Sequence, residues 1–174
     1  MDVAHLRSLI RDIPDFPKPG IVFKDITPLL GDAEGFRCTV DALAAKFADR
    51  AVDKVIGIEA RGFILAAPIA YLMGAGFVPV RKPGKLPWRT RVEEYTLEYG
   101  TDRLEMHHDG IIEGDNVLIV DDVLATGGTA AATLRLVEAA GGSVVGLGFV
   151  IELGFLGGRS RVAVHDPVAL LTYE

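Results

Sequence analysis

The most constraining feature of the sequence is the stretch 116–131, which reads NVLIVDDVLATGGTAA. It opens with an unbroken aliphatic run, which is typical of a strand that is covered on both faces. Asp121 and Asp122 stand where this strand is expected to end, and a glycine-rich turn then leads into a helix expected over 129–140. A buried strand, two acids and a glycine-rich turn that opens a helix together predict a phosphate-binding site.

The chemistry of the turn extends this prediction. Adjacent glycines let several backbone N–H groups converge on one anion, and Thr126 and Thr129 can donate hydroxyl hydrogen bonds. Carboxylates beside a phosphate repel it unless a positive charge or a hydrogen-bond donor lies between them. Mg²⁺ supplies the positive charge, and ribose hydroxyls supply hydrogen-bond donors. The pattern therefore predicts a sugar phosphate with a metal, whereas the Walker and G-x-G-x-x-G patterns are absent. An ordinary capped strand-to-helix turn is the alternative interpretation.

Strands and helices alternate along the chain, which predicts an α/β fold: a mostly parallel central sheet flanked by helices on both faces. Further strands are expected at 54–58, 76–80, 143–153 and 168–173, and helices after Asp32 and at 64–73. Ligands of such sheets bind beyond the carboxyl ends of the strands. Arg61, which follows the strand 54–58, is therefore expected at the same edge as the acidic pair. A surface arginine paired with Glu59 is the alternative.

The N-terminal part contains two expected segments. Leu6, Leu9 and Ile10 have helical spacing, so a short amphipathic helix is expected over 2–12 and ended by Pro14. The proline-rich segment 16–28 is expected to be an ordered loop or a short strand. It contains Phe23 and Lys24, which are either ligand contacts or a core aromatic and a solvated cation.

The segment after the strand 76–80 is conspicuously basic, with cations at 81, 82, 85, 89 and 91 separated by Pro83, Gly84 and Pro87. Its charge suits a mobile flap that closes on an anion, although a solvated loop has the same composition. Apolar and polar residues then alternate over 94–99 and 103–106, which predicts a hairpin that turns at residues 100–102 and covers the site.

Composition bounds the class of protein. The chain has 174 residues, of which 49% are hydrophobic and 24% charged, with a net charge of −6. This acidic balance argues against non-specific nucleic-acid binding. Cys38 is the single cysteine, no apolar run reaches about 18 residues, and the N-terminus has no signal-peptide core. We therefore expect one globular domain over 1–174, a cytoplasmic location and no membrane partner.

The segment V-L-I-V-D-D-V-L-A-T-G-G-T at 117–129 resembles the motif with which type I phosphoribosyltransferases bind 5-phosphoribosyl pyrophosphate (PRPP). Further stretches resemble those members of the family that act on adenine, in the same order along nearly the whole chain. They are F-P-K-P-G-I-V-F-K-D-I-T-P at 16–28, E-A-R-G-F at 59–63, R-K-P-G-K-L-P at 81–87, Y-T-L-E-Y-G at 95–100 and I-E-L at 151–153. The resemblance implies Mg²⁺-dependent transfer of the phosphoribosyl group from PRPP to adenine, giving AMP and pyrophosphate, in purine salvage.

The resemblance also implies the site residues. Those expected to hold the 5′-phosphate are Ala125, Thr126, Gly127, Gly128 and Thr129. Asp121 and Asp122 are expected to take the ribose hydroxyls, with Mg²⁺ nearby through PRPP or water and no direct protein ligand. The residues expected at pyrophosphate are Ala60, Arg61, Arg81, Lys82 and Lys85. Those expected at adenine are Val22, Phe23, Lys24 and Leu153, with Glu98 as the proton-transfer residue and Tyr99 in the covering loop. Some members have Arg at position 24, so the base contact of Lys24 is open.

The resemblance further implies a hood built from about residues 1–35 and the C-terminal segment, a flexible loop over about 82–106, and a homodimer. Two other functions are compatible with parts of the pattern. One is a non-catalytic regulator that senses PRPP or purine and binds DNA, which requires an added helix-turn-helix or a basic face. The other is a phosphoribosyltransferase for hypoxanthine, guanine, xanthine or orotate.

Overall fold

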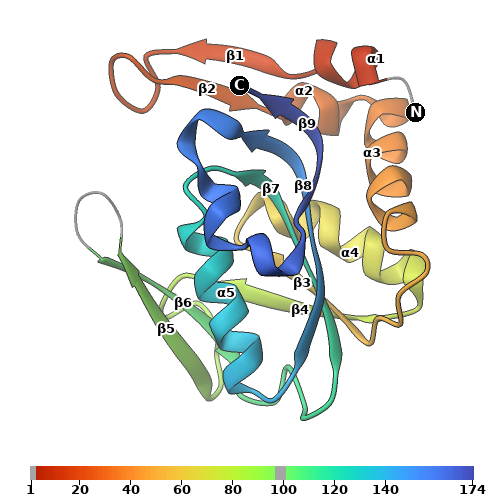
Figure 1. Cartoon of the computed structure of the whole chain (residues 1–174), viewed down its shortest axis with the longest axis vertical. Coiled ribbons are helices and arrows are strands. Elements are labelled where there is room, and N and C mark those ends of the chain that lie inside the picture. Colours follow the sequence, from red (N-terminus) through yellow and green to blue (C-terminus); the bar gives the residue numbers. More distant parts are fainter. Residues whose placement is uncertain (1–2, 97–100) are drawn as a thin grey trace.

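The computed structural model describes residues 3–96 and 101–174, and its centre is a seven-stranded sheet in the order β5-β6-β4-β3-β7-β8-β9 (Figure 1). Five neighbouring strands run parallel: β4 (Gly76–Arg81), β3 (Lys54–Ile58), β7 (Asn116–Leu124), β8 (Ser143–Leu153) and β9 (Val168–Tyr173). At one edge β6 (Thr101–His107) and β5 (Thr90–Thr96) are antiparallel. The sheet is thus mixed but mostly parallel, as predicted.

Helices cover both faces of this sheet because both faces are apolar. Along β7, Val117 and Ile119 belong to one buried cluster together with residues of α5 (Gly128–Ala139). Leu118 and Val120 belong to the other, with residues of α3 (Ala33–Ala45) and α4 (Arg61–Met73). Successive residues of a strand point to opposite faces, so an uninterrupted aliphatic run fits a strand with a helix layer on each side.

The N-terminal elements differ from the prediction. The expected N-terminal helix is present as α1 (Val3–Ser8), but its expected end is wrong, because Arg11–Pro14 form the strand β1 instead of a continuing helix. β1 pairs antiparallel with β2 (Val22–Asp25) as a separate two-stranded sheet, in which Asp12 is opposite Lys24. The helical spacing of the apolar residues misleads here because cross-strand pairing of β1 is not a local property.

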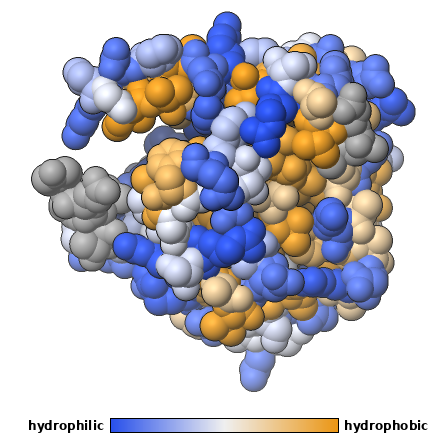
Figure 2. Space-filling view, turned by 45° about the horizontal axis from the view of Figure 1, so that its top comes forward, coloured by the Kyte–Doolittle hydropathy of each residue, from blue (hydrophilic) through white to orange (hydrophobic). Residues whose placement is uncertain are grey.

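This hairpin lies across one end of the molecule, where the chain also terminates (Figure 1). It is followed by α2 (Thr27–Gly31), whose second residue is Pro28, and then by α3, which Asp32 caps by accepting a hydrogen bond from the N–H of Gly35 at 2.7 Å. Both observations agree with the sequence, because proline is favoured in the first turn and aspartate at the N-cap. In the space-filling view the hairpin overhangs a hollow (Figure 2).

The edge hairpin β5–β6 is confirmed, but its turn is displaced from the prediction. Thr96 pairs with Thr101, so Thr101 and Asp102 belong to β6 and not to the turn. Much of the segment 82–106, which was expected to be a flexible loop, is therefore strand. Between β8 and β9 the chain forms three short 3-10 turns, η1 (Gly154–Leu156), η2 (Gly158–Arg161) and η3 (Ala163–His165). Within the described residues, no helix is long and apolar enough to span a membrane.

Candidate active site

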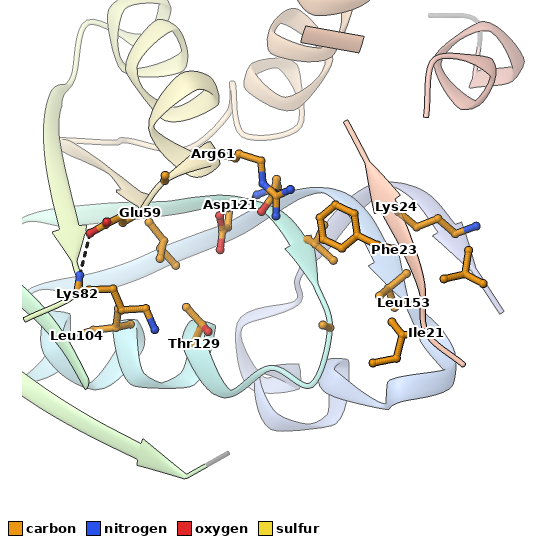
Figure 3. Close-up of a pocket in the computed structure, with 16 residues that line it drawn as sticks. Ile21, Phe23, Lys24, Glu59, Arg61, Lys82, Leu104, Asp121, Thr129 and Leu153 are labelled. Carbon is orange, nitrogen blue, oxygen red and sulfur yellow. Dashed lines mark hydrogen bonds and ion pairs between the residues drawn. The ribbon is translucent and has the colours of Figure 1, made fainter. Parts of the chain in front are cut away.

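A cavity of about 340 Å³ opens at the carboxyl ends of β3, β7 and β8 and is overhung by β2 (Figure 3). It brings together segments that are far apart in the sequence. The predicted site residues that line it are Val22, Phe23, Lys24, Ala60, Arg61, Lys82, Asp121, Asp122, Ala125, Thr129 and Leu153. Thr126, Gly127 and Gly128 line an adjoining cavity of about 70 Å³, which shares Asp121, Ala125 and Thr129 with the first. The predicted edge of the sheet is thus where these residues meet.

The glycine-rich turn is held by close backbone packing. Gly127 has a φ of 77° and precedes α5, so the turn needs a left-handed residue at this position. A Cβ on Gly127 would lie 2.5 Å from the carbonyl oxygen of Gly158. A Cβ on Gly158 would in turn lie 2.1 Å from the carbonyl oxygen of Ala125. The segment η2 therefore packs directly behind the turn and fixes its shape at the N-terminus of α5, where an anion is favoured.

The two acids lie inside β7 and not at its end, because β7 continues to pair with β8 as far as Leu124. Being adjacent in a strand, they point to opposite faces. Asp122 is buried, and its Oδ2 lies 2.7 Å from Nε of Arg61, whereas Oδ1 of Asp121 accepts a hydrogen bond from the N–H of Asp122. Desolvation raises the pKa of Asp121 well above its ordinary value, and repulsion from the Asp122 carboxylate adds to the rise.

The side chain of Glu59 binds three residues of the basic segment. Its carboxylate accepts hydrogen bonds from the N–H of Lys82 at 3.0 Å and from Nε of Arg81 at 3.2 Å, and it forms an ion pair with Lys85. Desolvation raises the pKa of Glu59, but the hydrogen bonds from Lys85 and Lys82 outweigh it and lower the pKa below the ordinary value. The basic segment is therefore held against the end of β3 by a carboxylate that lines the cavity.

Lys82 reaches from this segment to the edge hairpin. Its Nζ forms an ion pair with Asp102 of β6 and lies 3.4 Å from the hydroxyl of Tyr95, which donates to Oδ2 of Asp102 at 3.1 Å. The ring of Tyr95 is buried and packs toward Gly128 at the start of α5. The hairpin is thus connected to both the basic segment and the glycine-rich turn.

At the other end of the cavity, the side chains are apolar and aromatic. The ring of Phe23 lies 5.1 Å below the guanidinium carbon of Arg61 and packs edge-on against Phe16 at 5.3 Å. Leu153 lines the same region from the end of β8 (Figure 3). A flat apolar group would fit such walls. The ammonium of Lys24 points away from Phe23 and forms its contacts with Asp12 and Tyr173.

Comparison with known proteins assigns the family. Residues 33–165, more than half of the chain, match the family model "Phosphoribosyl transferase domain". An adenine phosphoribosyltransferase of Solibacter usitatus is 62% identical over 172 residues, covering 99% of both chains. This chain belongs to the adenine phosphoribosyltransferase family. It is accordingly an enzyme that transfers pentosyl groups, and not a non-catalytic regulator.

Solved structures of the family have the same fold. The adenine phosphoribosyltransferase of Rhodothermus marinus is 56% identical with a TM-score of 0.94, and the alignment covers 98% of each chain. That of Saccharomyces cerevisiae, complexed with adenine and an iminoaltritol bisphosphate, is 39% identical with a TM-score of 0.91 over 97% of this chain and 98% of the other. The α/β fold expected from the resemblance to type I phosphoribosyltransferases is thereby confirmed.

Not every predicted site residue of this family member falls in the cavity. Arg81 and Lys85 reach it through their contacts with Glu59. Glu98 and Tyr99 lie outside the described residues. The alternative pairing of Arg61 with Glu59 is wrong, because Arg61 pairs with Asp122. Sequence reasoning also missed residues that line the cavity, namely Ile21, Ile58, Glu59, Leu104 and Val123. Of these, Glu59 had a detectable signal, since it is the first residue after a buried strand that ends at the ligand edge.

Proposed function

We propose that this enzyme transfers the phosphoribosyl group from PRPP to adenine and releases AMP and pyrophosphate, as in purine salvage. The observation that carries the proposal is a pair of adjoining cavities whose lining residues are of three chemical kinds. The glycine-rich turn and acidic pair suit a ribose phosphate, the cations suit pyrophosphate, and Phe23 with Leu153 suits a planar base. The yeast relative complexed with adenine supports the choice of base.

In this assignment the phosphate end works through preorganised donors. The backbone N–H groups and hydroxyls of residues 125–129 hold the 5′-phosphate at the start of α5. Asp121 and Asp122 accept hydrogen bonds from the ribose hydroxyls. These contacts place the ribose C1 between the basic residues and the base.

The cations act on the leaving group. Breaking the bond from ribose C1 to pyrophosphate leaves positive charge on the sugar and additional negative charge on pyrophosphate, which Arg61, Arg81, Lys82 and Lys85 stabilise, with the backbone at Ala60 close by. All four cations are paired with carboxylates in the structure: Arg61 with Asp122, Arg81 and Lys85 with Glu59, and Lys82 with Asp102. We propose that they exchange these carboxylates for pyrophosphate oxygens when PRPP binds.

At the base end, adenine packs between Phe23 and Leu153 with the backbone near Val22 contacting its edge. Glu98 receives or relays the proton that the base loses as it attacks C1, and Tyr99 helps the covering loop to exclude water from PRPP. We also propose that the enzyme is a cytoplasmic homodimer. No nucleic acid or membrane partner is part of this proposal.

The donor set fits a Mg²⁺ ion that arrives with its substrate. Mg²⁺ prefers oxygen ligands and retains several waters, so it binds through one or two carboxylates and substrate phosphates. Asp121 and Asp122 line the cavity and would hold such an ion indirectly, through its waters or through PRPP, with no direct protein ligand. Bound there with PRPP, Mg²⁺ would neutralise charge that develops on pyrophosphate.

The test is a competition between bases. The enzyme is incubated with PRPP, Mg²⁺ and equimolar adenine, hypoxanthine, guanine, xanthine and orotate, and the nucleotides are separated by chromatography. We expect AMP to be the dominant product. A different dominant nucleotide would assign another base, and absence of any nucleotide despite PRPP binding would contradict the proposed activity.

A further inference from the structure

The phenol ring of Tyr173, in the last strand, contacts cations from two other elements. Nζ of Lys24 in β2 lies 4.2 Å from the ring centroid, and the guanidinium carbon of Arg7 in α1 lies 4.6 Å from it. Cations over an aromatic face are attracted by the negative face of the ring. One side chain of β9 therefore connects the N-terminal helix and the N-terminal hairpin with the edge of the main sheet.

Both cations are held in place by further contacts. Nζ of Lys24 lies 2.7 Å from Oδ1 of Asp12, its cross-strand partner in β1, and the Lys24 side chain is only 13% exposed. Arg7 also donates a hydrogen bond to the carbonyl oxygen of Thr172 at 3.0 Å. The contacts with Tyr173 thus form part of a network that spans β1, β2, α1 and β9.

The hairpin depends on such contacts because it is a separate two-stranded sheet. An isolated two-stranded hairpin is at best marginally stable in water, so its position must come from side chains that reach other elements. Val22 and Phe23 of this hairpin form one wall of the base end of the cavity. Leu153, on the opposite wall, pairs with Tyr173 in the register of β8 and β9. Tyr173 therefore contacts both sides of the base end: its ring contacts Lys24, next to Phe23 in β2, and its backbone pairs with Leu153 in β8.

We propose that Tyr173 is a positioning residue that sets the separation of Phe23 and Leu153 and thereby the affinity for the base. The inference rests on the proposed function, because it takes the space between these two residues as the base subsite. It assigns no contact with the substrate to Tyr173. Loss of the ring is expected to weaken binding of the base moiety while the phosphate end, formed by residues 121–129, keeps its affinity.

The test compares two ligands by isothermal titration calorimetry. AMP occupies the base end and the phosphate end, whereas ribose 5-phosphate occupies only the phosphate end. We expect Tyr173→Leu to weaken AMP binding about tenfold, the loss of two partly exposed cation–ring contacts, with ribose 5-phosphate changed by less than about twofold. Tyr173→Phe, the matched control, keeps the ring and is expected to bind both ligands like the wild type.

A second variant keeps the inference testable if Tyr173→Leu folds poorly. Arg7→Met removes one cation from the ring at an exposed position, and we expect AMP binding to weaken about threefold with ribose 5-phosphate unchanged. In the Tyr173→Leu background the Arg7→Met change should weaken AMP binding less than it does in the wild type, because only the hydrogen bond from Arg7 to the carbonyl oxygen of Thr172 is then left to lose. Equal losses for AMP and ribose 5-phosphate, or an unchanged ratio of the two affinities in both single variants, would overturn the inference. If the wild type binds AMP no more tightly than ribose 5-phosphate, the base subsite itself is wrong and the proposed function fails instead.

Discussion

Nε of Arg61 lies 2.7 Å from Oδ2 of Asp122, so a cation assigned to pyrophosphate is paired with a carboxylate assigned to the ribose. Arg61 is the first residue of α4, and Asp122 lies in β7, which pairs with β3 immediately before that helix. The ion pair joins the two halves of the site across neighbouring strands. In the proposed assignment, binding of PRPP separates this pair: Arg61 then contacts the pyrophosphate and Asp122 the ribose.

Arg61→Met should therefore impair use of PRPP. We expect kcat/KM for PRPP to fall about 10- to 100-fold, because a charge-assisted hydrogen bond contributes about 1.5–3 kcal/mol. Initial rates at varied PRPP and saturating adenine measure the effect. Arg37→Met, at an exposed position of α3, is the control and should match the wild type. An unchanged kcat/KM in Arg61→Met would remove Arg61 from the pyrophosphate site.

Comparing alanine variants of two glycines with positive φ distinguishes the effect of backbone strain from that of steric crowding at the glycine-rich turn. Gly127 and Gly74 have φ of 77° and 66°, but a Cβ on Gly127 would meet Gly158 at 2.5 Å, whereas at Gly74 nothing lies within 4 Å. We expect Gly127→Ala to lower the unfolding free energy by about 1–3 kcal/mol more than Gly74→Ala, the usual cost of overpacking. Urea denaturation measures both variants. Gly127→Ala should also weaken binding of ribose 5-phosphate, and equal behaviour of the two variants would argue against the close packing of η2 on this turn.

We expect Asp121→Asn to raise the thermal stability of the protein and to lower its activity. The pKa of Asp121 is raised in the folded protein, so folding favours its protonated form and the charged form destabilises the fold. This penalty is absent near pH 4, grows as the pH rises toward the folded pKa, and is complete above it. At pH 7 Asp121→Asn is thus expected to raise Tm by about 2–4 °C for each kcal/mol relieved.

Thermal melts of Asp121→Asn and the wild type at pH 7 and pH 4 check this sign. The gain in Tm should shrink at pH 4, where the wild-type carboxyl is also protonated. At pH 7 the same variant should have a lower kcat/KM, because it replaces a carboxylate that we propose binds the ribose. A Tm below that of the wild type at pH 7 would show that the Asp121 carboxylate stabilises the ligand-free fold.

Glu98 tests the proton-transfer assignment that follows from the family resemblance. Glu98→Gln should lower kcat about 10²- to 10⁴-fold, the usual contribution of general acid–base catalysis, with little change in KM for PRPP. Glu94→Gln is the matched control, since Glu94 is half-exposed on β5 and pairs with Arg103. If Glu98→Gln keeps the wild-type turnover, Glu98 has no role in proton transfer.

The sequence was most informative where local pattern and tertiary surroundings agree. The aliphatic run of β7 and the turn before α5 were both placed closely, because burial on two faces and left-handed glycine geometry leave local signatures. The end of β7 was misplaced because pairing of Leu124 with Glu152 on β8 extends the strand beyond the acids. The partner strand lies about 30 residues further along the chain, so the local sequence around Leu124 does not predict this pairing.

The contacts that assemble the site were the least predictable part. Glu59 binds cations of the basic segment that are 22–26 residues away in the sequence. Tyr173 meets Lys24 and Arg7 from the opposite end of the chain. Likewise, Gly158 shapes the phosphate turn from a segment that had no feature beyond its glycines. Each of these contacts joins segments that are far apart in the sequence, so no local pattern predicts it.

A crystal structure of the enzyme with AMP tests the account most directly. We expect the phosphate of AMP against the backbone of residues 125–129, the ribose hydroxyls facing Asp121 and Asp122, and the adenine ring between Phe23 and Leu153. AMP bound with its phosphate away from this turn, or with its base outside the gap between Phe23 and Leu153, would contradict the assignment of the cavity and the function that depends on it.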